Sequence, residues 1–140
     1  MRPFVGRTAF RASLERDDLL GLLPGLQLQR ENKLMRMLYL TVVAINHTAP
    51  SLEYLLHSIK YDSTHGTCRH SSDLSIEDDN LVFRGRKIIL FSQRDPLKLD
   101  WKSTGAEYVV ESTGKMCTTE LAYQHVTAGA KKVVISAPAK

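Results

Sequence analysis

Cysteine is scarce in this sequence, and long apolar runs are absent. Cys68 and Cys117 are the only cysteines, so they could form one pair at most. This excludes a disulfide framework and is typical of a protein that stays in a reducing cytosol. No apolar run is long enough to span a bilayer, and the N-terminus lacks the pattern of a secretory signal. We therefore expect a cytoplasmic chain with no membrane partner.

A strong excess of one charge sign is also lacking. The net charge is +4, and residues 19–39 supply half of it, with three basic residues against one acidic residue. No stripe of basic residues interleaved with aromatic residues is present, so we expect no nucleic-acid partner. The spacing of the cysteines and histidines fits no zinc site. The length of 140 residues suits one domain of ordinary size.

Two short runs rich in valine and isoleucine are the most informative feature of the sequence. Residues 108–111 and 132–136 have the pattern of strands, and the amphipathic residues 118–127 between them have the pattern of a helix. This order predicts two buried parallel strands joined by a crossover helix. Ligands of open parallel sheets lie beyond the carboxyl ends of the strands, where small residues leave room. Small residues follow both runs and are candidates for the floor of a ligand site: Ser112, Thr113, Gly114 and Ser136.

Further elements are expected on the N-terminal side of this unit. Residues 8–18 and 51–59 carry the apolar stripe of amphipathic helices. Residues 40–46 are rich enough in β-branched residues to predict a buried strand. Residues 73–91 alternate between apolar and polar around two turn signals, which predicts an antiparallel meander.

Several short segments carry sequence motifs that are more specific than these patterns. Residues 61–66 read YDSTHG, residues 93–96 read QRDP, and residues 105–114 read GAEYVVESTG. Together they closely resemble the NAD-binding domain of the phosphorylating glyceraldehyde-3-phosphate dehydrogenases. The resemblance is collinear from residue 41 to the C-terminus and resumes over residues 6–18. It implies an α/β fold, with a doubly wound, Rossmann-like parallel sheet that also carries an antiparallel meander.

The resemblance also implies a cofactor and a reaction. The complete enzymes of this family belong to glycolysis, where they oxidise an aldehyde to an acyl phosphate and transfer a hydride to NAD. We therefore expect NAD as the cofactor and an oxidoreductase as the class of protein.

Two features depart from the family pattern. The first strand is missing, and only Gly6 remains of the glycine-rich phosphate turn, because Met1 and Pro3 fall on the other two glycine positions. Residues 19–39 separate the helix at 8–18 from the next strand by far more than the ~2–6 residues usual for such a connection. We expect residues 1–140 to form a single partial dinucleotide-binding domain with 19–39 as an atypical insertion, and the catalytic domain to be absent. A genuine surface helix over residues 27–39 is the alternative to an insertion.

Eight residues fall on positions that the resemblance assigns to NAD. Gly6 belongs to the phosphate turn, Asn46 and His47 to the adenosine ribose, Arg94 to the adenine, and Ser112, Thr113, Gly114 and Ser136 to the nicotinamide-side ribose and the pyrophosphate. The family usually has Asn-Asp where this chain has Asn46 and His47, and a histidine supplies no fixed negative charge for the ribose hydroxyls. A solvent-facing loop histidine and an exposed turn arginine are the alternative interpretations of His47 and Arg94.

No catalytic residue is expected in the chain. Cys117 resembles the family nucleophile in its local Cys-Thr-Thr wording, but it lies inside the cofactor domain, and we interpret it as structural or incidental. His65, His70 and His125 lack a triad-like context that would make one of them a base. The sequence therefore predicts an inactive chain with impaired NAD binding. The alternative function is a non-catalytic interaction fragment that associates with full-length homologous subunits or other proteins through exposed sheet edges.

Overall fold

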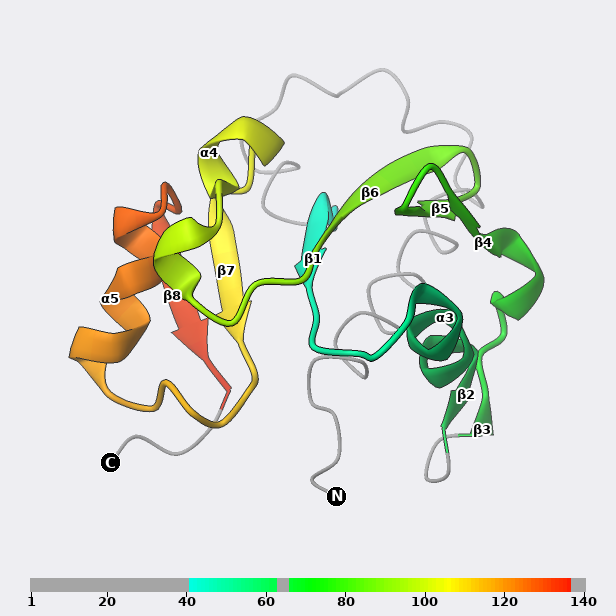
Figure 1. Cartoon of the computed structure of the whole chain (residues 1–140), viewed down its shortest axis with the longest axis horizontal. Helices are drawn as coiled ribbons and strands as arrows, with labels where there is room; N and C mark the ends of the chain where they lie inside the picture. The colour runs from blue at the N-terminus through cyan, green and yellow to red at the C-terminus, as the bar shows by residue number, and fades with distance from the viewer. Residues whose placement is uncertain (1–40, 63–65, 137–140) are drawn as a thin grey trace, which may run out of the picture.

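The computed structural model describes residues 41–62 and 66–136, which form two groups of strands with helices packed against them (Figure 1). Gly6, the helix predicted at 8–18, the block 19–39 and His65 lie outside the described residues. The predicted loss of a first strand concerns the same undescribed N-terminal part of the chain.

The first group is a four-stranded mixed sheet in the order β1-β6-β5-β4. Strand β1 (Ala44–Asn46) runs parallel to β6 (Arg86–Phe91). Strands β4 (Leu74–Glu77), β5 (Asn80–Phe83) and β6 form the antiparallel meander that the alternation predicted, which is confirmed. The strand predicted over 40–46 was too long, because residues 41–43 are not in strand conformation and only the carbonyl of Val43 reaches β6, at Ile89.

Helix α3 (Leu52–Lys60) follows β1 and packs against β4. It begins where the hydroxyl of Ser51 accepts a hydrogen bond from the backbone N–H of Tyr54, which satisfies one of the free donors of the first turn. Its apolar stripe buries Leu55 and Ile59 in a core with Leu81 and Phe83. The connection to β4 carries a short antiparallel pair, β2 (Tyr61–Asp62) with β3 (Gly66–Thr67), and the 3₁₀ turn η2 (Ser71–Asp73).

The second group is the predicted βαβ unit, and its three elements are confirmed. Strand β7 (Tyr108–Glu111) runs parallel to β8 (Lys132–Ile135), and α5 (Thr119–Thr127) connects them. Helix α5 begins at Thr118, whose hydroxyl accepts from the N–H of Leu121. The 3₁₀ turn η3 (Pro96–Lys98) and the short helix α4 (Trp101–Thr104) precede β7, and η3 packs against α5.

Burial of the β7–β8 pair is one-sided, which corrects the prediction of two strands buried on both faces. Val109 and Glu111 are buried toward α4 and α5. Val110 and Val134, which are register partners, are 52% and 54% exposed, and Tyr108 is 55% exposed. The reason is that α4 and α5 lie on the inner face, while no described helix covers the outer one. We call Tyr108, Val110 and Val134 the outer face of β7–β8.

Residues of β1 and β6 connect the first group of strands to the second. Ala44 of β1 and Phe91 of β6 pack against the core of the second group, which contains Trp101 and Val109. The rings of Phe91 and Trp101 meet edge to face at 5.7 Å between centroids. No hydrogen-bonded strand lies between β1 and β7 within the described residues.

A close approach of backbone joins α4 to the end of α5. The N–H of Trp101 donates to the carbonyl of Ala128 at 3.2 Å. Gly129 has φ +108°, and a Cβ at this position would lie 2.9 Å from both N and Cβ of Lys102. Only a residue without a Cβ fits this contact.

Candidate cofactor site

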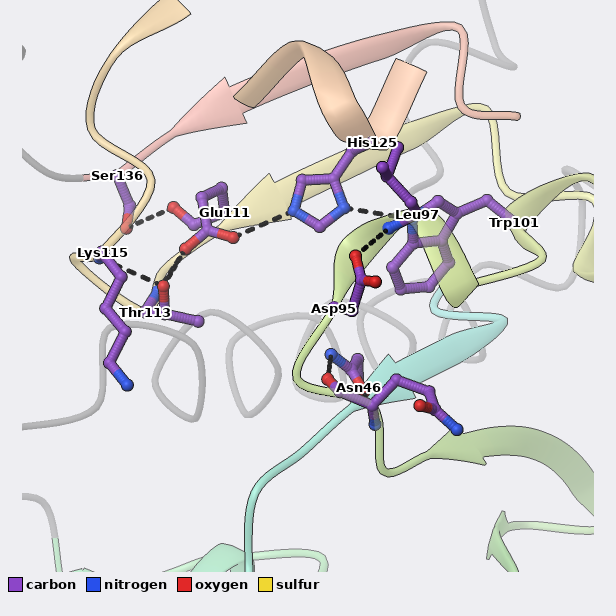
Figure 2. Close-up of polar contacts among 10 residues, drawn as sticks. Asn46, Asp95, Leu97, Trp101, Glu111, Thr113, Lys115, His125 and Ser136 are labelled. Atoms are coloured by element: carbon purple, nitrogen blue, oxygen red, sulfur yellow. Dashed lines mark hydrogen bonds and ion pairs between the residues drawn. The ribbon is translucent and has the colours of Figure 1, made fainter. Parts of the chain in front are cut away.

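The carboxyl end of β7 is organised around a buried carboxylate, that of Glu111 (Figure 2). The glutamate side chain is 5% exposed. Its Oε1 accepts hydrogen bonds from the backbone N–H of Thr113 at 2.7 Å and from the Thr113 hydroxyl at 2.5 Å. Its Oε2 lies 3.1 Å from Nε2 of His125, which is also 5% exposed. Three donors therefore converge on one buried anion.

The protonation pattern of His125 follows from its second neighbour. The indole N–H of Trp101 lies 3.2 Å from Nδ1 of His125, and an indole nitrogen can only donate. Nδ1 must therefore be the unprotonated acceptor, and Nε2 carries the proton that it donates to Glu111. This assigns His125 as neutral, with both ring nitrogens occupied.

The pKa of Glu111 reflects a balance between burial and hydrogen bonding. Burial, the largest single influence, raises the pKa, but the hydrogen bonds from His125 and Thr113 together outweigh it and hold the pKa below its usual value. The carboxylate is thus ionised at neutral pH. Glu111 and Trp101 were not among the site residues predicted from the sequence, and His125 was expected only to lack a triad-like context; the structure shows that His125 has a carboxylate partner, Glu111.

The predicted site residues beyond β7 and β8 lie close to this carboxylate. Ser136, after β8, donates its hydroxyl and its backbone N–H to the carbonyl of Glu111, at 3.1 and 3.0 Å. The Thr113 oxygen also accepts from the N–H of Lys115. Gly114 adopts φ +71°, which closes the turn. Ser112 is half-buried and makes no hydrogen bond with the described residues.

The carboxyl end of β1 is held by a side-chain amide. Asn46 donates from Nδ2 to the carbonyl of Gln93 at 2.8 Å and accepts from the N–H of Gln93 at 2.9 Å. Both bonds connect the end of β1 to the loop after β6. One N–H and one lone pair of the Asn46 amide are thereby engaged within the chain.

His47 is the next residue, and it is half-buried. Burial lowers the pKa of its imidazole, which is therefore neutral at pH 7. Its Nδ1 accepts from the N–H of Ala49 at 3.2 Å. A hollow of about 310 Å³ opens beside it and contains none of the other predicted site residues; its lining is His47, Ala49, Pro50, Ser51, Leu52, Asp79, Leu90 and Ser92.

Arg94 lies between the two strand ends in sequence and is exposed. It makes no hydrogen bond or ion pair with the described residues, which leaves its guanidinium available to a ligand. The following residue, Asp95, accepts from the N–H of Leu97 and starts η3. The backbone on the C-terminal side of Arg94 is therefore fixed, although its side chain is not.

Cys117 has the surroundings of a structural residue. It is 8% exposed, and its thiol donates to the carbonyl of Gly114 at 3.2 Å. Cys117 and Cys68 are both free and buried. Because both nitrogens of His125 are engaged, neither is available to deprotonate the Cys117 thiol.

The described residues suit NAD better at one end of this edge than at the other. Beyond β7 and β8, Ser112 and Gly114 place no bulky side chain at the strand ends. At the position after β1 that the resemblance assigns to the adenosine ribose, the chain has neutral His47 instead of a carboxylate. Among residues 41–62 and 66–136 there is no group of three side chains suited to a metal ion. None of the helices in these ranges is both long and apolar enough to cross a membrane.

The parallel pairs β1–β6 and β7–β8, with polar loops at their carboxyl ends, define an α/β domain of the Rossmann-like, dinucleotide-binding class. Residues 27–119 match the family model of the glyceraldehyde 3-phosphate dehydrogenase, NAD binding domain. The chain therefore belongs to that family, and NAD is the cofactor of the family.

Curated proteins with sequences similar to this chain are named glyceraldehyde-3-phosphate dehydrogenase, like the family model. Cytosolic glyceraldehyde-3-phosphate dehydrogenase of Gracilaria gracilis is 38% identical over 136 residues, which cover 97% of this chain and 34% of the relative. Glyceraldehyde-3-phosphate dehydrogenase of Phaffia rhodozyma is 50% identical over 97 residues, or 69% of this chain and 28% of the relative. Glyceraldehyde-3-phosphate dehydrogenase 2 of Drosophila pseudoobscura pseudoobscura is 50% identical over 98 residues, or 70% and 29%. The chain spans about a third or less of the length of these relatives.

Proposed function

We propose that these 140 residues form a partial NAD-binding domain of a cytoplasmic glyceraldehyde-3-phosphate dehydrogenase, which on its own binds NAD weakly and does not oxidise the aldehyde. NAD, when bound to a complete enzyme, accepts the hydride. The residues of this chain would hold its nicotinamide side at Ser112 and Gly114 and its adenine at Arg94. The family match and the names of the relatives support the identity of the domain.

Among the described residues, the state of His47 supports weak binding, and it is the smaller of two deficits. Its imidazole is neutral because burial lowers the pKa, and its Nδ1 already accepts from Ala49. The adenosine ribose would therefore receive no negative charge from residue 47 itself. The glycine turn, reduced to Gly6 in the sequence, adds a second deficit in backbone donors to the phosphates.

Absence of turnover by these residues alone has a separate basis. Acyl transfer of this kind needs a thiolate and a base in contact. Cys117 is buried against Gly114, and His125 is occupied by Trp101 and Glu111. No described thiol and base are arranged for this step.

Isothermal calorimetry with NAD tests the proposal directly. We expect no saturable binding at micromolar concentrations of the unmodified chain. His47→Asp alone should not restore binding, whereas deletion of residues 19–39 together with an added first strand and an intact glycine turn should. Micromolar binding by the unmodified chain would show that the site is assembled differently.

A second function, association with full-length homologous subunits, is favoured by the outer face of β7–β8. Its three apolar side chains are each more than half exposed, and β1 and β7 each have one edge with no described partner strand. Co-purification with a full-length family enzyme tests this function. Val110→Lys should abolish capture, and Leu97→Lys, at a similarly exposed apolar position on η3, should not. Equal capture by both variants would exclude the outer face as the interface.

A further inference from the structure

We propose that Glu111 and His125 are positioning residues that hold the turn of Ser112, Thr113 and Gly114 in one geometry and withdraw Thr113 from the donors offered to a cofactor. The role assigned to the turn rests on the proposed NAD site, but the contacts themselves do not. A chain that binds no NAD can therefore still satisfy the test below.

The first step of the argument is the saturation of Thr113. Its N–H and its hydroxyl proton are both donated to Oε1 of Glu111, at 2.7 and 2.5 Å. Its hydroxyl oxygen in turn accepts from Lys115. A hydroxyl has one proton to give, so Thr113 has no donor left for a phosphate or a ribose oxygen. The groups of this turn that remain available are those of Ser112 and Gly114.

The second step is the direction of the hydrogen-bond chain. Trp101 can only donate, so His125 accepts at Nδ1 and donates at Nε2, and Glu111 accepts. Whether each residue donates or accepts is set by the residue before it. This series of hydrogen bonds begins at α4, continues through α5 and ends at the turn beyond β7 (Figure 2). Because all three side chains are buried, water cannot replace a lost partner without opening the core. The orientation of the turn is therefore determined by helices on the inner face of the sheet.

The isosteric variant Glu111→Gln exposes this dependence. A glutamine amide has one acceptor and one donor group, whereas the site needs an acceptor toward both Thr113 and His125. If the amide oxygen faces Thr113, the NH₂ group opposes the Nε2–H of His125. His125 can then accept only by moving its proton to Nδ1, where it opposes the indole N–H of Trp101. One pair of opposed donors remains in every arrangement.

The experiment compares Glu111→Gln with Glu107→Gln by NMR of the whole chain. Glu107 is the matched control, since it precedes the same strand and forms an exposed ion pair with Lys131 at 2.7 Å. In Glu111→Gln we expect the indole N–H resonance of Trp101 to shift if the amide oxygen faces Thr113, and amide exchange of Thr113 to rise about tenfold or more if the NH₂ group faces it, because a hydrogen bond to a charged group is then lost. Trp101 is the only tryptophan, so its resonance is unambiguous. Glu107→Gln should change neither signal.

Equal exchange of Thr113 together with an unchanged indole resonance of Trp101 in the two variants would overturn the proposal. If Glu111→Gln does not fold, the unmodified chain decides, because ¹⁵N shifts of its imidazoles report the tautomer of His125. We expect a neutral ring protonated at Nε2. A ring protonated at Nδ1, or at both nitrogens near neutral pH, would contradict the assigned chain of donors. Calorimetry with NAD tests the proposed function separately and does not bear on this outcome.

Discussion

The ends of β7 and β1 occupy equivalent places in the two parallel pairs, but they are built from different chemistry. At the end of β7, three donors surround a buried anion. At the end of β1, the neutral side-chain amide of Asn46 forms two hydrogen bonds with the backbone of Gln93. The carboxylate that organises the end of β7 lies inside the domain, at Glu111. The family pattern places a carboxylate at the end of the second strand, where this chain has His47.

Removal of the buried carboxylate should have the largest effect on stability. Glu111→Ala leaves the buried Nε2–H of His125 and the N–H of the exposed Thr113 without their acceptor, and we expect a loss of about 2–3 kcal/mol. Urea unfolding followed by circular dichroism measures it. Glu107→Ala is the control and should cost less than about 1 kcal/mol, because its ion pair is exposed. Similar losses of unfolding free energy in the two variants would contradict the prediction that the buried glutamate stabilises the fold more than the exposed one.

Removal of the two hydrogen bonds between Asn46 and Gln93 should have an intermediate effect on stability. Asn46→Ala leaves the N–H and carbonyl of Gln93 unpaired near the surface, where water can reach them, and we expect a loss of about 1–2 kcal/mol. Asn46→Asp keeps the acceptor for the N–H of Gln93 and loses only the donor, so its loss should be smaller. Amide exchange at Gln93 locates the effect. A larger loss for Asn46→Ala than for Glu111→Ala would reverse the comparison.

As the pH falls, the end of β1 should lose stability first and the end of β7 second. Burial places the pKa of His47 in the folded chain below its unfolded value near 6.5, so the unfolded chain takes up a proton first and stability begins to fall as the pH drops below that value. The pKa of Glu111 is also lowered, from 4.5, so its contribution is complete above 4.5 and is lost as the pH falls through the folded pKa.

Urea midpoints measured against pH, with amide exchange of Gln93 and Thr113 as local probes, test this order. His47→Gln should remove the loss of stability in the upper window and leave the lower one. Loss of protection at Thr113 before Gln93 would contradict it.

The smallest effect is expected at the residue between the two ends. Arg94 is exposed and has no bond to the described residues, so Arg94→Ala should change stability by no more than about 0.5 kcal/mol. A loss well above this, in the same urea experiment, would indicate that the arginine is part of one of the two networks.

The sequence predicted the βαβ unit almost to the residue because local pattern and tertiary context agree there. The Val/Ile runs ended where β7 and β8 end, and Thr118 was close to the expected start of the helix. The strand at 40–46 was overestimated: β6 begins at Arg86, but the segment before Ala44 does not follow it, and of residues 41–43 only Val43 joins the ladder, where its carbonyl accepts from the N–H of Ile89. A β-branched composition cannot reveal that limit.

The network around Glu111 was missed, although the sequence held a signal. Glu111 lies two positions after buried Val109 in a strand and so shares its face. His125 lies three positions after buried Ala122 in a helix and shares its stripe. An ionisable residue at a core position of each element predicts a buried pair. That Trp101 completes it could not be predicted, since only the approach of α4 to α5 brings the indole there.

The approach of α4 to α5 at Gly129 has a consequence for which substitutions the domain tolerates. Alanine at 129 would meet Lys102 at 2.9 Å in addition to an unfavourable φ, whereas a side chain at Gly105 would suffer from φ alone because no atom lies within 4 Å. In a library selected for soluble expression, codon 129 should therefore remain glycine while asparagine is accepted at 105. One missing methyl group at position 129 thus allows the approach of α4 that keeps the indole of Trp101 within reach of His125.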